Sequence, residues 1–258
     1  MRSTVTKRAL QGFEVAVLAG TVAAEVLVGR ESEWQPAVLA GLLILLAFFS
    51  EWFSVELSEG TLSASTIAIV LAMGLLGPGP AAACGVAAVI ISSAARRVSL
   101  RQWLNNLATF AAVPFAGGLA VRLIGERFGL LHGNGSSSVV LGLVLLGVFI
   151  VALVANFLFV GLRVIVEDGR SLRRQLPEFI PLLPGEIAAG ALAATLAIAY
   201  RAAGLPTLVA ASVVLLIFQH LTVALLRSEE RAEQLQARSR QLVGLQLGVL
   251  RTLVRALE

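Results

Sequence analysis

The sequence predicts an all-α protein: a polytopic integral membrane helical bundle of about eight spans, followed by a C-terminal cytoplasmic signalling helix. Of its 258 residues, 57% are hydrophobic and only 14% are charged, whereas a soluble domain carries roughly a quarter charged residues. Continuous apolar stretches recur, most of them near the ~20 residues that cross ~30 Å of hydrocarbon. Basic residues gather in alternate connections between these stretches, as the positive-inside rule requires. An integral membrane protein is therefore the predicted class.

The predicted spans are continuous rather than alternating in polarity, which excludes strands because lipid leaves open sheet edges unsatisfied. The segments are 9–28, 36–53, 62–77, 79–95, 103–124, 138–160, 177–200 and 205–226. The third and fourth are short, and "GPGP" at 77–80 predicts a tight turn between antiparallel helices. In the seventh, "PEFIPLLPG" places Pro177, Pro181 and Pro184 where they would break or bend its start.

Charge bias tests the span count. With eight spans and both termini in the cytoplasm, sixteen of the twenty basic residues lie on the inner side. The first apolar stretch has no small-residue cleavage site after it, so we expect a retained helix. One inner loop disagrees: "SEWFSVELSEGTLS" at 50–63 holds Glu51, Glu56 and Glu59 and no basic residue. It is either a plain solvated connection or a re-entrant, cavity-lining binding element, and in the second case six segments cross.

The residues that most active sites require are missing. The chain has two histidines, His132 and His220, and one aspartate, Asp168, and a metal centre needs several such donors around one ion. GxSxG and GxxxxGK[ST] motifs are absent. Cys84 is the only cysteine, which excludes disulfide frameworks and cysteine metal clusters. We therefore expect no catalytic residue, metal or cofactor. Because the basic residues lie in loops and at the ends, we expect no nucleic-acid partner.

Polar residues inside the spans are the candidates for ligand binding or sensing, because a charge at mid-bilayer costs at least ~2.5–3.5 kcal/mol. The candidates are Glu14, Glu51, Asn105, Asn156, Glu186 and His220. Glu186 follows the proline-rich start of the seventh segment, and broken helices beside a carboxylate form polar pockets in membrane proteins. Each has a structural alternative. Glu14 and Glu186 would lie at an interface, and Glu51 would lie in a solvated connection. The asparagines would form interhelical hydrogen bonds, and His220 would be a packed or interface histidine.

The last stretch, 227–258, differs from everything before it and divides the chain into a membrane domain, 1–226, and a connector. It alternates charged and apolar positions at helical spacing. The apolar stripe consists of Leu235, Leu242, Leu245, Val249, Leu253 and Leu257. Such a stripe predicts a cytoplasmic juxtamembrane helix that pairs with a second copy as a coiled coil. A homodimer through 227–258 is therefore expected.

Several short strings carry a resemblance to a known family. They are "SEWF" at 50–53, a Ser/Thr-rich start at 61–66, "LLGPGPAAACGVAAVI", "ARRVSLRQWLNNLATF", Asn156, "IPLLPGEIAAG" and the tail "LGVLRTLVRALE". Over roughly residues 36–258 the chain resembles a MASE-type bacterial membrane-associated sensor domain, as found before HD-GYP and other HD-type phosphodiesterase domains. The resemblance implies a protein of the bacterial inner membrane with a cytoplasmic effector after residue 258. No position matches a catalytic residue of that effector.

Two functions remain open on the sequence. The first is a sensory input module that transmits ligand occupancy through the dimeric connector to an HD-type cyclic-di-nucleotide (cyclic di-GMP) phosphodiesterase. The second is a small-solute transporter, or the substrate-binding membrane subunit of one, which would use Glu51 and the region around Glu186. A membrane-embedded enzyme is disfavoured, because paired aspartates, His-rich loops and a serine–histidine pair are all absent.

Overall fold

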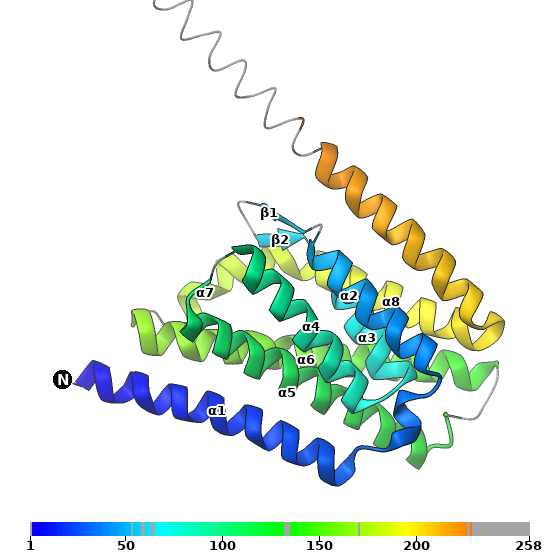
Figure 1. Cartoon of the computed structure of the whole chain (residues 1–258), viewed down its shortest axis with the longest axis horizontal. Coiled ribbons are helices and arrows are strands. Elements are labelled where there is room, and N and C mark those ends of the chain that lie inside the picture. The colour runs from blue at the N-terminus through cyan, green and yellow to red at the C-terminus, as the bar shows by residue number, and fades with distance from the viewer. Residues whose placement is uncertain are drawn as a thin grey trace, which may run out of the picture.

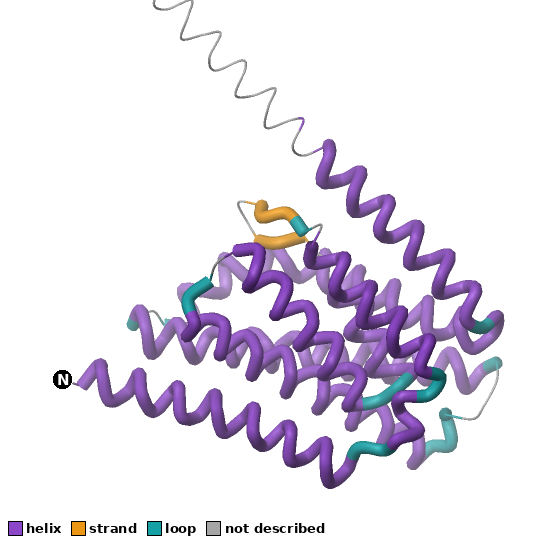
Figure 2. The backbone as a smooth tube through the Cα atoms, viewed as in Figure 1, coloured by secondary structure: helices purple, strands orange, loops and turns teal. Residues whose placement is uncertain are grey.

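The computed structural model describes residues 2–52, 54–57, 60–62, 65–96, 98–131, 135–169, 171–225 and 228. Within them the chain is a bundle of helices with one small hairpin (Figures 1 and 2). The helices are α1 (Arg2–Val28), α2 (Ala37–Trp52), α3 (Ser65–Leu75), α4 (Pro78–Arg96), α5 (Leu100–Arg127), α6 (Ser136–Asp168), α7 (Leu172–Phe179) and α8 (Leu183–Ala203). Two 3-10 turns, η1 (Glu31–Trp34) and η2 (Ile180–Leu182), join them, and a further helix covers Leu205–Leu225.

Six helices of the described chain are long and apolar enough to cross a membrane. They are Arg8–Val28, Pro78–Ala95, Leu100–Arg127, Ser136–Val166, Leu172–Ala203 and Leu205–Leu225. Two further apolar helices, α2 and α3, have 16 and 11 residues, or about 24 and 16 Å at 1.5 Å per residue. Both are shorter than the ~30 Å hydrocarbon layer. These six helices confirm the predicted class, a helical multi-pass membrane protein.

The short helix α3 forms the centre of the bundle. Eight of its eleven residues are buried, because α2, α4, α5, α6 and α8 all pack around it. Its sequence, "STIAIVLAMGL", is apolar on every face after the first two residues, which suits a helix enclosed by others. By contrast, α1 lies at the edge of the bundle (Figure 1), and only 6% of its apolar stretch is buried.

The predicted tight turn between the third and fourth segments is confirmed. Helix α3 ends at Leu75 and α4 begins at Pro78, with Gly77 between them at a φ of +130°. An L-residue rarely adopts that φ, so glycine is needed there. The turn also packs closely on α5, since a Cβ on Gly118 would lie 2.8 Å from Pro78 N.

Two of the three prolines of the seventh segment, Pro181 and Pro184, lie where the helix changes, as expected, whereas Pro177 lies inside α7. The segment is divided into α7, the 3-10 turn η2 and α8, because proline lacks the N–H that continues the helical hydrogen-bond pattern. Pro181 lies inside the turn, and Pro184 occupies the first turn of α8. The interruption places Glu186 in that same first turn.

The acidic loop between α2 and α3 contains an antiparallel hairpin of β1 (Val55–Leu57) and β2 (Gly60–Leu62), with Val55 opposite Leu62. The sequence did not predict these strands, and whether the loop is a solvated connection or a binding element stays open. The hairpin lies at one end of the bundle (Figure 2). The predicted connector, including Leu235, Leu242, Leu245, Val249 and Leu253, lies outside the described residues.

Candidate solute-binding cavities

A cavity of about 280 Å³ lies between α3, α5, α6 and the α7–α8 break. We call it the Glu186 cavity. Its polar lining includes Thr66, Thr109, Asn156 and Glu186, and its aromatic lining is Phe110, Phe149, Phe157 and Phe179. Two of the residues predicted from sequence, Asn156 of α6 and Glu186 of α8, are thus brought to one cavity.

The carboxylate of Glu186 has few hydrogen-bond or ion-pair partners in this cavity. Its Oε2 accepts a hydrogen bond from the Thr66 hydroxyl at 3.2 Å, and this is its only hydrogen-bond partner among the residues that the structure describes. No arginine or lysine of that part of the chain forms an ion pair with it. A carboxylate in a largely apolar setting is costly unless a cation or hydrogen-bond donor accompanies it. The cavity therefore favours a ligand that supplies one.

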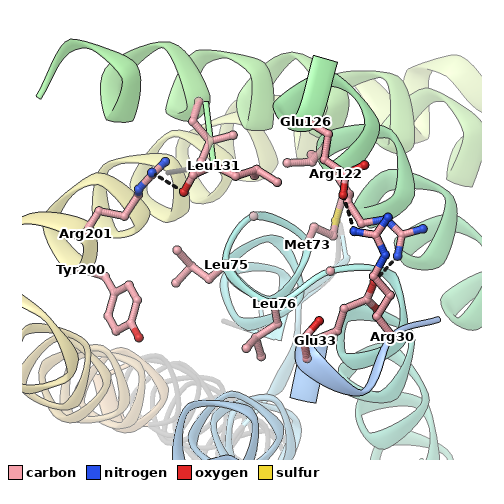
Figure 3. Close-up of a pocket in the computed structure, with 15 residues that line it drawn as sticks. Arg30, Glu33, Met73, Leu75, Leu76, Arg122, Glu126, Leu131, Tyr200 and Arg201 are labelled. Carbon is pink, nitrogen blue, oxygen red and sulfur yellow. Dashed lines mark hydrogen bonds and ion pairs between the residues drawn. The ribbon is translucent and has the colours of Figure 1, made fainter. Parts of the chain in front are cut away.

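A second cavity, of about 450 Å³, lies at the opposite end of α3, and we call it the Arg122 cavity (Figure 3). Its charged lining consists of Arg30, Glu33, Arg122, Glu126 and Arg201. In Figure 3 the first four of these gather on one side, while Arg201 and Tyr200 lie on the other, across Leu75 and Leu76 at the end of α3.

The charges of the Arg122 cavity are largely neutralised within the protein. Arg122 forms an ion pair with Glu33, and both side chains are buried. Arg30 pairs with Glu126 in a more exposed position. Arg201 donates hydrogen bonds to the carbonyl of Leu130 at 2.9 Å and to that of Leu131 at 2.7 Å (Figure 3).

The sequence interpretation missed the Arg122–Glu33 pair. Arg122 stands near the end of the predicted segment 103–124, and an arginine within an apolar span requires a partner. Glu33, in the connection after the first span, was available by charge, although the sequence does not show that η1 folds back to bring it there. Arg122 also donates to the carbonyl of Val28 at 3.1 Å, which fixes the end of α1 to α5.

Met73 links the two cavities, because it is part of the wall of both. It lies on α3 and is only 2% exposed. Its Cε occupies the space that a side chain on Gly117 of α5 would fill. Among the described residues, Met73 is the one that the two linings share.

The other predicted candidates line neither cavity. Glu14 is buried in α1 and accepts a hydrogen bond of 2.8 Å from the Asn105 amide on α5. Glu51, at the end of α2, accepts one of 2.6 Å from the Ser65 hydroxyl at the start of α3. These contacts join neighbouring helices. His220 is exposed on the helix Leu205–Leu225.

No group of three or more His, Cys, Asp or Glu side chains in the described part of the chain is arranged to hold a metal ion. Comparisons with protein-family models, curated proteins and solved structures find no match.

Proposed function

We propose that this chain is the solute-binding sensory module of a bacterial inner-membrane signalling protein, with the Glu186 cavity as its ligand site. The observation that carries the proposal is the Glu186 carboxylate, which has one hydroxyl partner in a cavity that is otherwise largely apolar. A group so costly to bury is more useful for recognition than for packing.

The cavity lining favours a small ammonium compound with an apolar body. A positive charge complements the carboxylate, and the four phenylalanine rings offer apolar contact. Aromatic faces also attract cations, although Phe157 and Phe179 cover one face of each other by stacking, with centroids 4.4 Å apart. The amide of Asn156 and the hydroxyl of Thr66 supply additional hydrogen bonds. A carboxylate ligand would meet repulsion from Glu186.

Ligand binding would reach the C-terminal connector through α8. Phe179, Leu182 and Glu186 of the broken segment line the cavity, and α8 leads through Gly204 into the helix Leu205–Leu225. A ligand that binds two positions of α8 unequally shifts the equilibrium between them. We propose that residues 227–258 then pass this shift, as a homodimer, to a cytoplasmic HD-type effector.

The orientation belongs to the same proposal. Helix α3 lies inside the bundle, and α2 packs against α3 and α4 while exposing Val38, Leu45 and Trp52. We propose that these two short helices carry the chain across and back, so that it passes eight times. Arg30, Arg122, Arg127 and Arg201 then lie on the outer side, and both termini lie in the cytoplasm.

Binding to the purified protein tests the ligand site. We expect butylammonium to bind more tightly than butanol, and butyrate to bind least, by calorimetry in lipid nanodiscs. Glu186→Gln should weaken butylammonium binding at least about tenfold, since a charge-assisted hydrogen bond contributes roughly 1.5–3 kcal/mol. Glu31→Gln removes an exposed glutamate and should leave binding unchanged. Equal binding of all three compounds, or equal effects of the two variants, would refute the site.

A transporter is the second candidate function, and the Arg122 cavity at the opposite end of α3 favours it. Two measurements separate the functions. Ligand-dependent disulfide cross-linking of Leu242→Cys or Val249→Cys in native membranes would support the sensor. Saturable uptake of butylammonium into proteoliposomes, without such cross-linking, would instead support the transporter.

A further inference from the structure

We infer that the Arg122 cavity and the Glu186 cavity are two halves of one route for small ammonium compounds, closed between them by the Met73 side chain. The inference rests on the proposed ligand site and adds how the ligand reaches it, namely from the Arg122 end of the bundle.

The barrier in this proposal is the Met73 side chain. Met73 borders both cavities, and Gly117 on the facing helix α5 offers no side chain of its own. A methionine has three rotatable side-chain bonds and adapts to irregular spaces. One change of rotamer at Met73 would therefore open the space in front of Gly117, with no displacement of a helix.

The Arg122 cavity suits a cation despite its three arginines. Two of them are ion-paired with Glu33 and Glu126, and Arg201 is bonded to two carbonyls. The last residues of α3, Met73 to Leu75, line this cavity together with Leu76 and Gly77 of the following turn, and a helix C-terminus carries partial negative charge on its free carbonyls. Oε2 of Glu33 is also buried without a hydrogen-bond partner among the described residues. These acceptors lead toward Glu186 on the far side of Met73.

Cysteine accessibility tests the route. In a Cys84→Ala background, Ala152→Cys places a thiol on the wall of the Glu186 cavity, and Leu75→Cys places one on the wall of the Arg122 cavity. Membrane-impermeant methanethiosulfonate reagents, one with an ammonium group and one with a sulfonate group, are applied to intact cells and to inside-out vesicles. The side from which Leu75→Cys reacts identifies the Arg122 end, so no orientation is assumed.

From that side, the rate at which Ala152→Cys reacts should rise as residue 73 becomes smaller, from Met to Val to Ala, by about tenfold or more in total. Leu71→Ala is the matched control, because Leu71 is equally buried on the same helix and lines neither cavity. The ammonium reagent should react faster than the sulfonate reagent, and Glu186→Gln should reduce that preference.

The outcomes distinguish the two proposals. Equal effects of Met73→Ala and Leu71→Ala, or no effect of either, would overturn the route even if butylammonium binding depends on Glu186. A graded effect at residue 73 with no preference for the ammonium reagent would keep the route but refute its selectivity for cations. Loss of folding in Met73→Ala still leaves the Met73→Val variant to decide.

Discussion

The two cavities treat a buried carboxylate in opposite ways. In the Arg122 cavity, Glu33 of η1 is ion-paired with Arg122 of α5. In the Glu186 cavity, Glu186 has only the Thr66 hydroxyl among the described residues. In the first case an arginine of the protein offsets the desolvation free energy of the carboxylate. In the second case a bound ligand would have to offset it. The first arrangement stabilises the fold, whereas the second reserves binding energy for recognition.

Breaking the Arg122–Glu33 pair should have the largest effect on stability. Arg122→Met keeps most of the side-chain length but leaves the Glu33 charge buried alone, which should cost about 3–5 kcal/mol. Unfolding by denaturant in detergent micelles would measure this loss. Adding Glu33→Gln should restore much of it, because the remaining side chain is neutral. A loss below about 1 kcal/mol for Arg122→Met alone would show that the pair does not stabilise the fold.

Two adjacent glycines of α5 test how tightly the residues near the two cavities are packed. Gly118→Ala should cost about 1–3 kcal/mol, since its Cβ would meet the backbone of Pro78 at the α3–α4 turn. Gly117→Ala should cost less than about 1 kcal/mol, because its Cβ would clash with the far end of the flexible Met73 side chain, while Val148 Cγ1 lies at an ordinary contact distance of 3.7 Å. Thermal unfolding of both variants in one detergent is the measurement. The reverse order would show that Met73 is held rigidly, against the proposed route.

Glu186→Gln should have the smallest effect on stability. Because the carboxylate has no ion-pair partner in the described chain, the neutral amide should change the unfolding free energy by no more than about 1 kcal/mol, or stabilise the protein slightly. Thr66→Val is the companion variant, and it removes the hydroxyl while leaving the carboxylate in place. The same denaturant titration applies to both. A loss as large as that of Arg122→Met would mean that Glu186 holds the fold together.

Much of the helical framework follows from the sequence, because apolar length and proline position depend on local chemistry. The turn at Gly77 and the break at Pro181 are confirmed where "GPGP" and "PEFIPLLPG" predicted them. The burial of α3 was not predicted, since a helix that is apolar on all faces can lie against lipid or inside protein with the same pattern.

The sites were harder to predict than the helices, because they depend on which helices become neighbours. Single residues such as Asn156 and Glu186 stood out by polarity alone, but their shared cavity depends on the packing of α3, α5, α6 and α8. The sequence does not distinguish Met73 from the other apolar residues of its segment, so its place between the cavities could not be predicted. Glu14 and Asn105, candidates on the same grounds, instead bond to each other.

The shortness of α3 has an electrical consequence. Where water enters both cavities, a voltage across the membrane would fall mainly over the few ångströms around Met73 rather than over the full hydrocarbon thickness. A charge stepping past that side chain would then experience most of the ~2.3 kcal/mol that 100 mV exerts on one elementary charge. Occupancy of the Glu186 cavity by a cation would then follow the membrane potential as well as the concentration of the cation at the Arg122 end of the bundle.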